Sequence, residues 1–171
     1  MYGIGCSPSA PAAIERIYAA KGRPRDKPLA LYFATVEQML EYARNDSRAL
    51  ALARAFLPGP LTIVVRRPPF VDGRIVGGLP TLGLRVPNHE LCAALLARCG
   101  PLAATSANLS GATPYSGRDD SAREDLPEAD YFIDAGPAPL GVASTVVDLS
   151  GDDVRLLRSG SLPFDEIERA L

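Results

Sequence analysis

The chain has 171 residues, of which 47% are hydrophobic and 22% charged, and its formal net charge is -2. A chain of this length can bury most of its apolar surface around one centre, so we expect a single domain spanning residues 1–171. The slight acidity excludes a protein that coats nucleic acid or membranes through bulk positive charge, and any anion must therefore be held by a local group of cations.

Cysteine usage and hydropathy bear on the compartment. The three cysteines, Cys6, Cys92 and Cys99, are an odd and sparse set, unlike the dense, even set of a secreted disulfide framework. No apolar run reaches the roughly 18 residues of a membrane span, and the start of the chain has no signal-peptide pattern. We expect a cytoplasmic protein without membrane contact.

The first third of the chain alternates helix and strand patterns. Apolar residues three and four apart predict a helix from Pro11 that ends at about Gly22. Residues 29–35 are an apolar run of strand length. Residues 36–56 have the pattern of one or two helices, with the break just before Ser47, a good N-cap residue.

The rest of the chain is richer in strand patterns. Apolar and β-branched runs predict strands at residues 61–67, 82–86, 101–105, 130–134, 144–149 and 154–158. The Pro- and Gly-rich residues 68–80 indicate an irregular surface loop. A helix is expected from a cap at Asn88 to about Arg98, with Leu91, Leu95 and Leu96 facing inward, and residues 164–171 close as a short helix. The alternation predicts an α/β domain with a mixed, partly parallel sheet.

A basic loop, KGRPRDKP at residues 21–28, follows the first predicted helix. In one interpretation its cations are solvated, and Lys21 neutralises the negative end of that helix. In the other the loop binds a polyphosphate, because prolines fix its backbone, Gly22 permits close approach and arginine forks bond phosphate oxygens in pairs. The loop by itself leaves both interpretations open.

The tripeptide SAN, Ser106 to Asn108, directly follows a predicted strand. In α/β sheets, ligands bind beyond the carboxyl ends of strands, where small polar residues let hydroxyl, amide and N–H groups reach them. Such tripeptides also make ordinary turns, and the stretch alone does not separate a binding loop from a turn.

The histidine and cysteine patterns point away from metal and nucleophile sites. With His89 as its single histidine, the chain cannot form a histidine-rich metal centre, and any Ser/His/Asp triad would need His89 at an expected helix start. Cys92 and Cys99 lie seven apart among leucines and alanines, which favours core thiols over nucleophiles. We expect no metal-binding residues.

Seven segments share their order and spacing with one known family. They are YGIGC (2–6), KGRPRDKPL (21–29), PGPLTIVV (58–65), TLGLRVP (81–87), SANLSG (106–111), STVVD (144–148) and LLRSG (156–160). Together they resemble the YrdC-like family, which contains the threonylcarbamoyl-AMP synthases of the TsaC type. The resemblance covers nearly the whole chain, with K-x-R and S-x-N as its distinctive motifs. It implies the YrdC/RibB-like fold, a twisted mixed β-sheet flanked by helices.

The resemblance implies an enzyme that joins L-threonine, bicarbonate or CO2, and ATP into L-threonylcarbamoyladenylate and releases pyrophosphate. Partner proteins then pass the threonylcarbamoyl group to an adenosine in tRNA, so contact with tRNA is indirect or weak. ATP is a substrate and is accompanied by Mg2+. The reaction suits a site without histidine, because in-line attack of a carbamate oxygen on the α-phosphorus needs positioning and charge neutralisation above all.

The resemblance also assigns residues. Lys21 and Arg23 match the K-x-R that grips ATP phosphates and are the expected catalytic pair, with Arg25 and Lys27 as auxiliaries. The other expected ATP contacts are Thr81, Ser106, Asn108, Ser116 and Arg158. The expected threonine contacts are Tyr32, Arg85, Ala104 and Ser144.

Two departures from the family pattern bear on these assignments. The family has an extra strand and a P-T-x-T segment directly before Y-G-x-G, whereas this sequence begins at Met1. We expect Met1 to be an internal methionine, with a threonine-contacting Thr just upstream. The stretch ATPYSG (112–117), which holds Ser116, replaces the more usual S-P-T-like continuation.

Two other functions stay open. One is a YrdC-like module that binds nucleotide or RNA without turnover, for which the basic loop is the argument. The 6% aromatic content and the lack of a broad basic composition weigh against RNA as its main ligand. The other is a domain that handles a different carbamoyl-adenylate, as the YrdC-like domain of hydrogenase maturation proteins does.

Overall fold

A computed structural model describes residues 1–44, 46–118, 126–138 and 142–171. Seven strands in these ranges form one sheet in the order β1-β5-β2-β4-β3-β6-β7. Their bounds are β1 Gly3–Cys6, β2 Ala30–Tyr32, β3 Leu61–Arg66, β4 Thr81–Arg85, β5 Leu102–Ser106, β6 Thr145–Asp148 and β7 Arg155–Arg158. The β2/β4 and β3/β6 pairs are parallel and the other neighbours antiparallel. The predicted mixed α/β sheet is confirmed.

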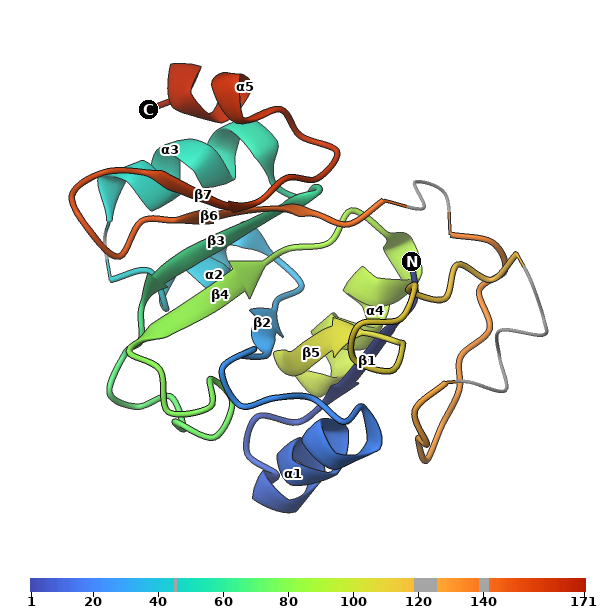
Figure 1. The fold of residues 1–171 in the computed structure, drawn as a ribbon. Coiled ribbons are helices and arrows are strands. Elements are labelled where there is room, and N and C mark those ends of the chain that lie inside the picture. Colours follow the sequence, from blue (N-terminus) through green and yellow to red (C-terminus); the bar gives the residue numbers. More distant parts are fainter. Residues whose placement is uncertain (45, 119–125, 139–141) are drawn as a thin grey trace.

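Helices flank this sheet, which curls strongly from β7 to β1 (Figure 1). Their bounds are α1 Pro11–Ala20, α2 Val36–Leu40, α3 Ser47–Phe56, α4 Glu90–Cys99 and α5 Phe164–Arg169. In Figure 1, α3 and α5 lie beside the β3-β6-β7 end of the sheet, and α1 lies near the opposite end. Among the helices of the described ranges, none has the length and apolar character needed to cross a bilayer.

Strand alternation divides the sheet into a core face and an open face. Leu31, Ile63 and Leu84 are at most 1% exposed and pack in the core with residues from α1, α2, α3 and α5. Each such aliphatic side chain contributes about 1.5–3 kcal/mol through burial. Because neighbouring residues of a strand point to opposite faces, Ala30 and Gly83 lie on the open face.

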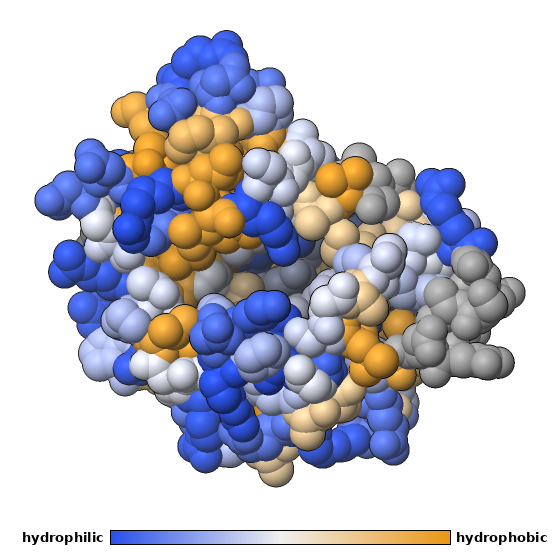
Figure 2. Space-filling view, in the orientation of Figure 1, coloured by the Kyte–Doolittle hydropathy of each residue, from blue (hydrophilic) through white to orange (hydrophobic). Residues whose placement is uncertain are grey.

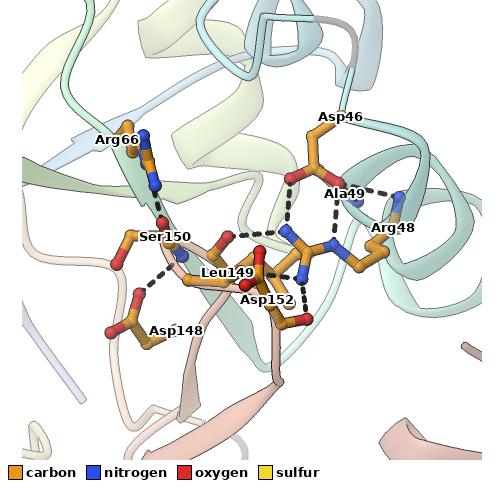
Figure 3. Close-up of polar contacts among 9 residues, drawn as sticks. Asp46, Arg48, Ala49, Arg66, Asp148, Leu149, Ser150 and Asp152 are labelled. Carbon is orange, nitrogen blue, oxygen red and sulfur yellow. Dashed lines mark hydrogen bonds and ion pairs between the residues drawn. The ribbon is translucent and has the colours of Figure 1, made fainter.

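One arginine ties the turn between β6 and β7 to the start of α3 (Figure 3). The Arg48 guanidinium donates to the backbone oxygens of Leu149, Gly151 and Asp152 at 2.8, 2.9 and 2.7 Å. It also pairs with the Asp46 carboxylate at 3.0 Å. That carboxylate also accepts hydrogen bonds from the backbone N–H groups of Arg48 and Ala49 in the first turn of α3. The Asp46 and Arg48 side chains together therefore fix both the start of the helix and the β6–β7 turn.

Several local expectations were wrong. Asp46, not Ser47, caps α3, because the aspartate side chain reaches the free N–H groups. Residues 130–134 are irregular instead of a strand, and the side chain of Tyr131 is 90% exposed. The strand β1 was not predicted, because its sequence GIGC carries too few β-branched residues to give a strand pattern.

Two further differences concern burial. Leu91 and Leu95 are 42% and 37% exposed, so of the three leucines expected to face inward from α4 only Leu96 does so. The N-cap position of α4 is His89, without a side-chain cap, instead of Asn88. The expected surface loop at 68–80 is irregular, yet it contributes buried side chains such as Ile75 to the core.

Replacing Arg48 with Met should lower the free energy of unfolding by about 2–3 kcal/mol, because several backbone oxygens lose a charged donor. Urea unfolding of the two proteins measures the difference. Arg54→Met is the matched control, since Arg54 is exposed on the same helix, and it should change stability by less than about 0.5 kcal/mol. Equal effects of the two substitutions would contradict the role given to Arg48.

Candidate functional site

Four adjacent strands contribute one row of residues with little or no side chain to the open face. Gly5 pairs with Ala104, Ala104 with Ala30, and Ala30 with Gly83. A Cβ atom added to Gly83 would lie 3.2 Å from the Ala30 Cβ, so larger side chains would crowd this row. Figure 2 shows the molecule hollowed in its middle, in the region that the curled sheet partly encloses in Figure 1. The row keeps bulky side chains off this part of the open face.

Lys21 lies at one border of this face, directly after α1. Gly22 adopts a left-handed φ of 55°, which turns the chain away from the helix and is easy for glycine alone. The Lys21 ammonium donates to the backbone oxygen of Ser106 at 2.5 Å, to the backbone oxygen of Asn108, and to Asn108 Oδ1 at 3.4 Å. The K-x-R and S-x-N segments therefore meet, although the ammonium itself is 1% exposed.

The turn that follows β5 is closed by its own side chains. Ser106 Oγ donates to Asn108 Oδ1 at 2.6 Å, and Asn108 Nδ2 donates to the backbone oxygens of Leu109 and Ala112 at 2.7 and 2.8 Å. Asn108 is only 9% exposed, and its side-chain amide is already hydrogen-bonded within the turn. The segment is thus a turn, as one interpretation of the sequence held, and its role in ligand binding stays a prediction.

Arg23 extends from the same loop and is held by backbone oxygens. Its Nε donates to the Lys27 oxygen at 2.7 Å and its Nη2 to the Pro28 oxygen at 3.0 Å. Burial, followed by the nearby charge of Arg158, lowers the pKa of Arg23. Two guanidinium groups close enough to repel each other create a region that favours an anion.

Arg158, at the end of β7, is fixed by a chain of hydroxyl contacts. Its Nη2 donates to the Ser144 backbone oxygen at 2.8 Å and to Ser144 Oγ at 3.0 Å. Ser144 Oγ lies 2.9 Å from Thr62 Oγ1 on β3. Burial and the charge of Arg85 lower the pKa of Arg158, which places Arg85 in the same group of cations.

Arg85 and Tyr32 are register partners on the open face of β4 and β2. Arg85 Nη1 lies 3.4 Å from the Tyr32 hydroxyl, and its guanidinium carbon is 5.4 Å from the ring centroid. Arg85 Nε is buried and has no hydrogen-bond partner within the described residues. A buried donor without an acceptor is a candidate contact for a ligand.

The other expected site residues have different surroundings. Arg25 pairs with Glu15 and lies over the Tyr18 ring, 4.4 Å from its centroid, so its charge is engaged by α1. Lys27 is exposed. The Ser116 oxygen accepts from Ala138 N at 2.7 Å. Thr81 begins β4 on the same face as Gly83 and Arg85, and Ala104 belongs to the small-residue row.

Sequence reasoning missed Thr62, which the structure joins to Ser144. The available signal was its place in the segment PGPLTIVV, as a hydroxyl residue in an otherwise apolar strand. It also missed Tyr2, whose hydroxyl accepts from Ala135 N and donates to Asp134 at 3.0 Å. Tyr2 thereby ties the start of β1 to residues 134–136.

Comparisons with known proteins decide the family. The profile of the Sua5/YciO/YrdC family, described as telomere recombination, matches residues 1–160. The chain belongs to the Sua5/YciO/YrdC family. Over its full length it is 39% identical to a threonylcarbamoyl-AMP synthase of Pyrococcus abyssi and 35% identical to one of Bacillus subtilis. It spans only 51% and 50% of these relatives.

A solved structure of the family agrees with the fold. The chain superposes on P. abyssi Sua5 complexed with L-threonine with a TM-score of 0.88 at 40% identity, covering 99% of this chain and 50% of that one. The family resemblance and the twisted mixed sheet expected from the sequence are thus both confirmed.

Burial and the charge of Arg23 lower the pKa of Lys21 to about 8. An unfolded lysine titrates near ~10.4, so between these values the unfolded chain holds more protons than the folded one. The contribution of Lys21 to stability should therefore rise with pH across this window and stay constant below it. NMR titration of the Lys21 Cε resonance should give a midpoint near 8, and a midpoint above about 10 would contradict it.

Replacing Thr62 with Val removes the hydroxyl that supports Ser144 and, through it, Arg158. If Arg158 binds a nucleotide phosphate, as the family resemblance implies, the substitution should lower ATP affinity about tenfold, because one hydrogen bond that orients the guanidinium is lost. Calorimetric titration with ATP measures the loss. Ser144→Ala should give a similar loss and the double variant no larger one, whereas independent losses would show that the two hydroxyls do not act in series.

Proposed function

We propose that this chain is a YrdC-like domain, residues 1–171, that makes L-threonylcarbamoyladenylate from L-threonine, bicarbonate or CO2, and ATP. The observation that carries the proposal is a group of cations around a floor of small residues. Its members are Arg23, Arg85 and Arg158, and none of them takes part in an ion pair within the described residues. The charge of Lys21 lies next to Arg23, but its ammonium is bonded to the turn after β5. Charges gathered without carboxylate partners suit a substrate that brings several negative charges.

The ATP half of the proposed site uses the border between the basic loop and β7. Arg23 and Arg158 are the proposed phosphate contacts, since their guanidinium groups repel each other and a phosphate chain would relieve that repulsion. Ser106 and Asn108 are proposed for the nucleotide at the end of β5. Further ATP contacts are proposed for Thr81, Ser116, Arg25 and Lys27, of which Arg25 would first have to leave Glu15.

The threonine half lies around Arg85. A carboxylate placed against this guanidinium would satisfy its buried Nε. The hydroxyl of Tyr32 beside Arg85, and that of Ser144 beside Arg158, are proposed for the other polar groups of the amino acid. Ala104 leaves space on the floor. The related P. abyssi Sua5 has been crystallised with L-threonine, which supports an amino-acid site in this fold.

The proposed reaction has two steps. The threonine amine and bicarbonate first give a carbamate and water. A carbamate oxygen then attacks the α-phosphorus of ATP, the new P–O bond forms, and the bond to pyrophosphate breaks. The cations lower the barrier by neutralising charge that develops on the phosphates. Mg2+ would accompany ATP as part of the substrate and supply further charge neutralisation on its phosphates. The described residues contain no group of three or more His, Cys, Asp or Glu side chains that could hold a metal ion.

We also propose a role in tRNA threonylcarbamoyladenosine modification in the cytoplasm. The adenylate is a mixed anhydride, so partner proteins must capture it and transfer its threonylcarbamoyl group to tRNA. The names of the relatives support this assignment, and the chain matches about half of the length of the first two of them.

Pyrophosphate release tests the proposal. Release should require ATP, Mg2+, bicarbonate and L-threonine together, and carbamoyl phosphate should not replace threonine and bicarbonate. ATP binding with no threonine-dependent release would instead indicate a binding module. Release driven by carbamoyl phosphate would favour a domain for another carbamoyl-adenylate.

Arg23→Met and Arg158→Met should each lower kcat/KM for ATP by about 10²–10³, by analogy with the removal of one preorganised donor to a developing anion. Steady-state pyrophosphate release gives the values. Arg98→Met, an exposed position on α4, is the control and should leave kcat/KM unchanged. A loss below about threefold for Arg23→Met would exclude a transition-state role for that residue.

A further inference from the structure

Lys21 is tied to the turn after β5 from both its ends. Its side-chain ammonium is bonded to Ser106 and Asn108, as described above, and its backbone oxygen accepts from Ser110 N at 2.8 Å. These contacts join residues that are 85 to 89 positions apart in the sequence. We call the four contacts the Lys21 clasp.

The ammonium has no donor left for a phosphate. A lysine side chain carries three N–H bonds, and three oxygen atoms of residues 106 and 108 lie within 3.5 Å of Nζ. Lys21 as a whole is also only 1% exposed, so its ammonium lies inside the protein, bonded to the turn and away from solvent. A ligand on the open face would therefore meet the turn and not the ammonium.

The turn depends on the Lys21 clasp for its position relative to the rest of the protein. Its internal bonds, from Ser106 Oγ and Asn108 Nδ2, shape the turn but do not anchor it to the rest of the molecule. The Lys21 clasp and the bond from Ala107 N to the Tyr2 oxygen at 2.9 Å supply such anchors. Loss of the ammonium would leave two backbone oxygens without their charged donor and let the turn move.

We infer that Lys21 is a positioning residue that holds the S-x-N turn in its ligand-binding place and does not itself contact the phosphates. The nature of the ligand rests on the proposed function. A lysine suits this position better than an arginine, because the three oxygens converge on a single nitrogen atom, whereas a guanidinium spreads its donors over the edge of a planar fork. Lys21→Arg should therefore fail to rescue nucleotide binding, although arginine is a good phosphate ligand.

Amide hydrogen exchange tests the position of the turn directly. In Lys21→Met, the amides of Ser110 and Ala112 should exchange at least about tenfold faster, because a charged hydrogen bond has been removed. The amides of β3 should keep their rates, which separates local opening from global destabilisation. Arg98→Met is the control for a loss of charge elsewhere and should leave the turn protected. Unchanged exchange of the turn in Lys21→Met would overturn the inference.

A double-mutant cycle on ATP affinity tests the link to binding. Lys21→Met and Asn108→Ala should each weaken binding by about tenfold or more, and the double variant should be no weaker than the worse single one. Multiplying losses, or binding by Lys21→Arg as tight as wild type, would show a direct contact and overturn the inference. If the wild-type chain released no pyrophosphate, the proposed function would fail while the exchange result still decided the role of Lys21.

Discussion

The site depends on the contact between the Lys21 ammonium and the turn after β5. This contact joins the end of α1 to the end of β5, although the two elements are far apart in the sequence. It thereby brings together the K-x-R and S-x-N segments, which hold many of the polar side chains of the candidate site. A buried lysine is stable only when its donors are satisfied. Three oxygens of Ser106 and Asn108 accept these hydrogen bonds, and the same bonds hold the turn in place.

The basic loop divides its cations among different tasks. Lys21 faces inward, Arg25 is engaged by Glu15, and Arg23 lies near Arg158 and donates to backbone oxygens. The number of cations in the loop therefore overstates the positive charge that the loop offers to a ligand. Three cations without a carboxylate partner in the described part of the chain, Arg23, Arg85 and Arg158, come from the loop, β4 and β7, and the curl of the sheet brings them together.

The floor of the site has a role equal to that of its charges. Gly5, Ala30, Gly83 and Ala104 hold no bulk above the open face, while the residues that alternate with them, such as Leu31 and Leu84, fill the core. The same strands thus provide packing on one side and space on the other. Small residues in the middle of strands weaken them locally, and the large core residues on either side of each offset that loss.

The sequence by itself determined the mixed sheet, the helix after Pro11 and the family, because apolar periodicity and ordered motifs are local properties of the chain. Tertiary structure alone decided which cations are engaged by other protein groups, since Lys21, Arg25 and Arg23 look alike in sequence and differ only in their partners. It also decided that Thr62 supports Ser144, that β1 is a strand and that residues 130–134 are not. Pairing partners and burial arise between segments far apart in the chain, and a local pattern does not contain them.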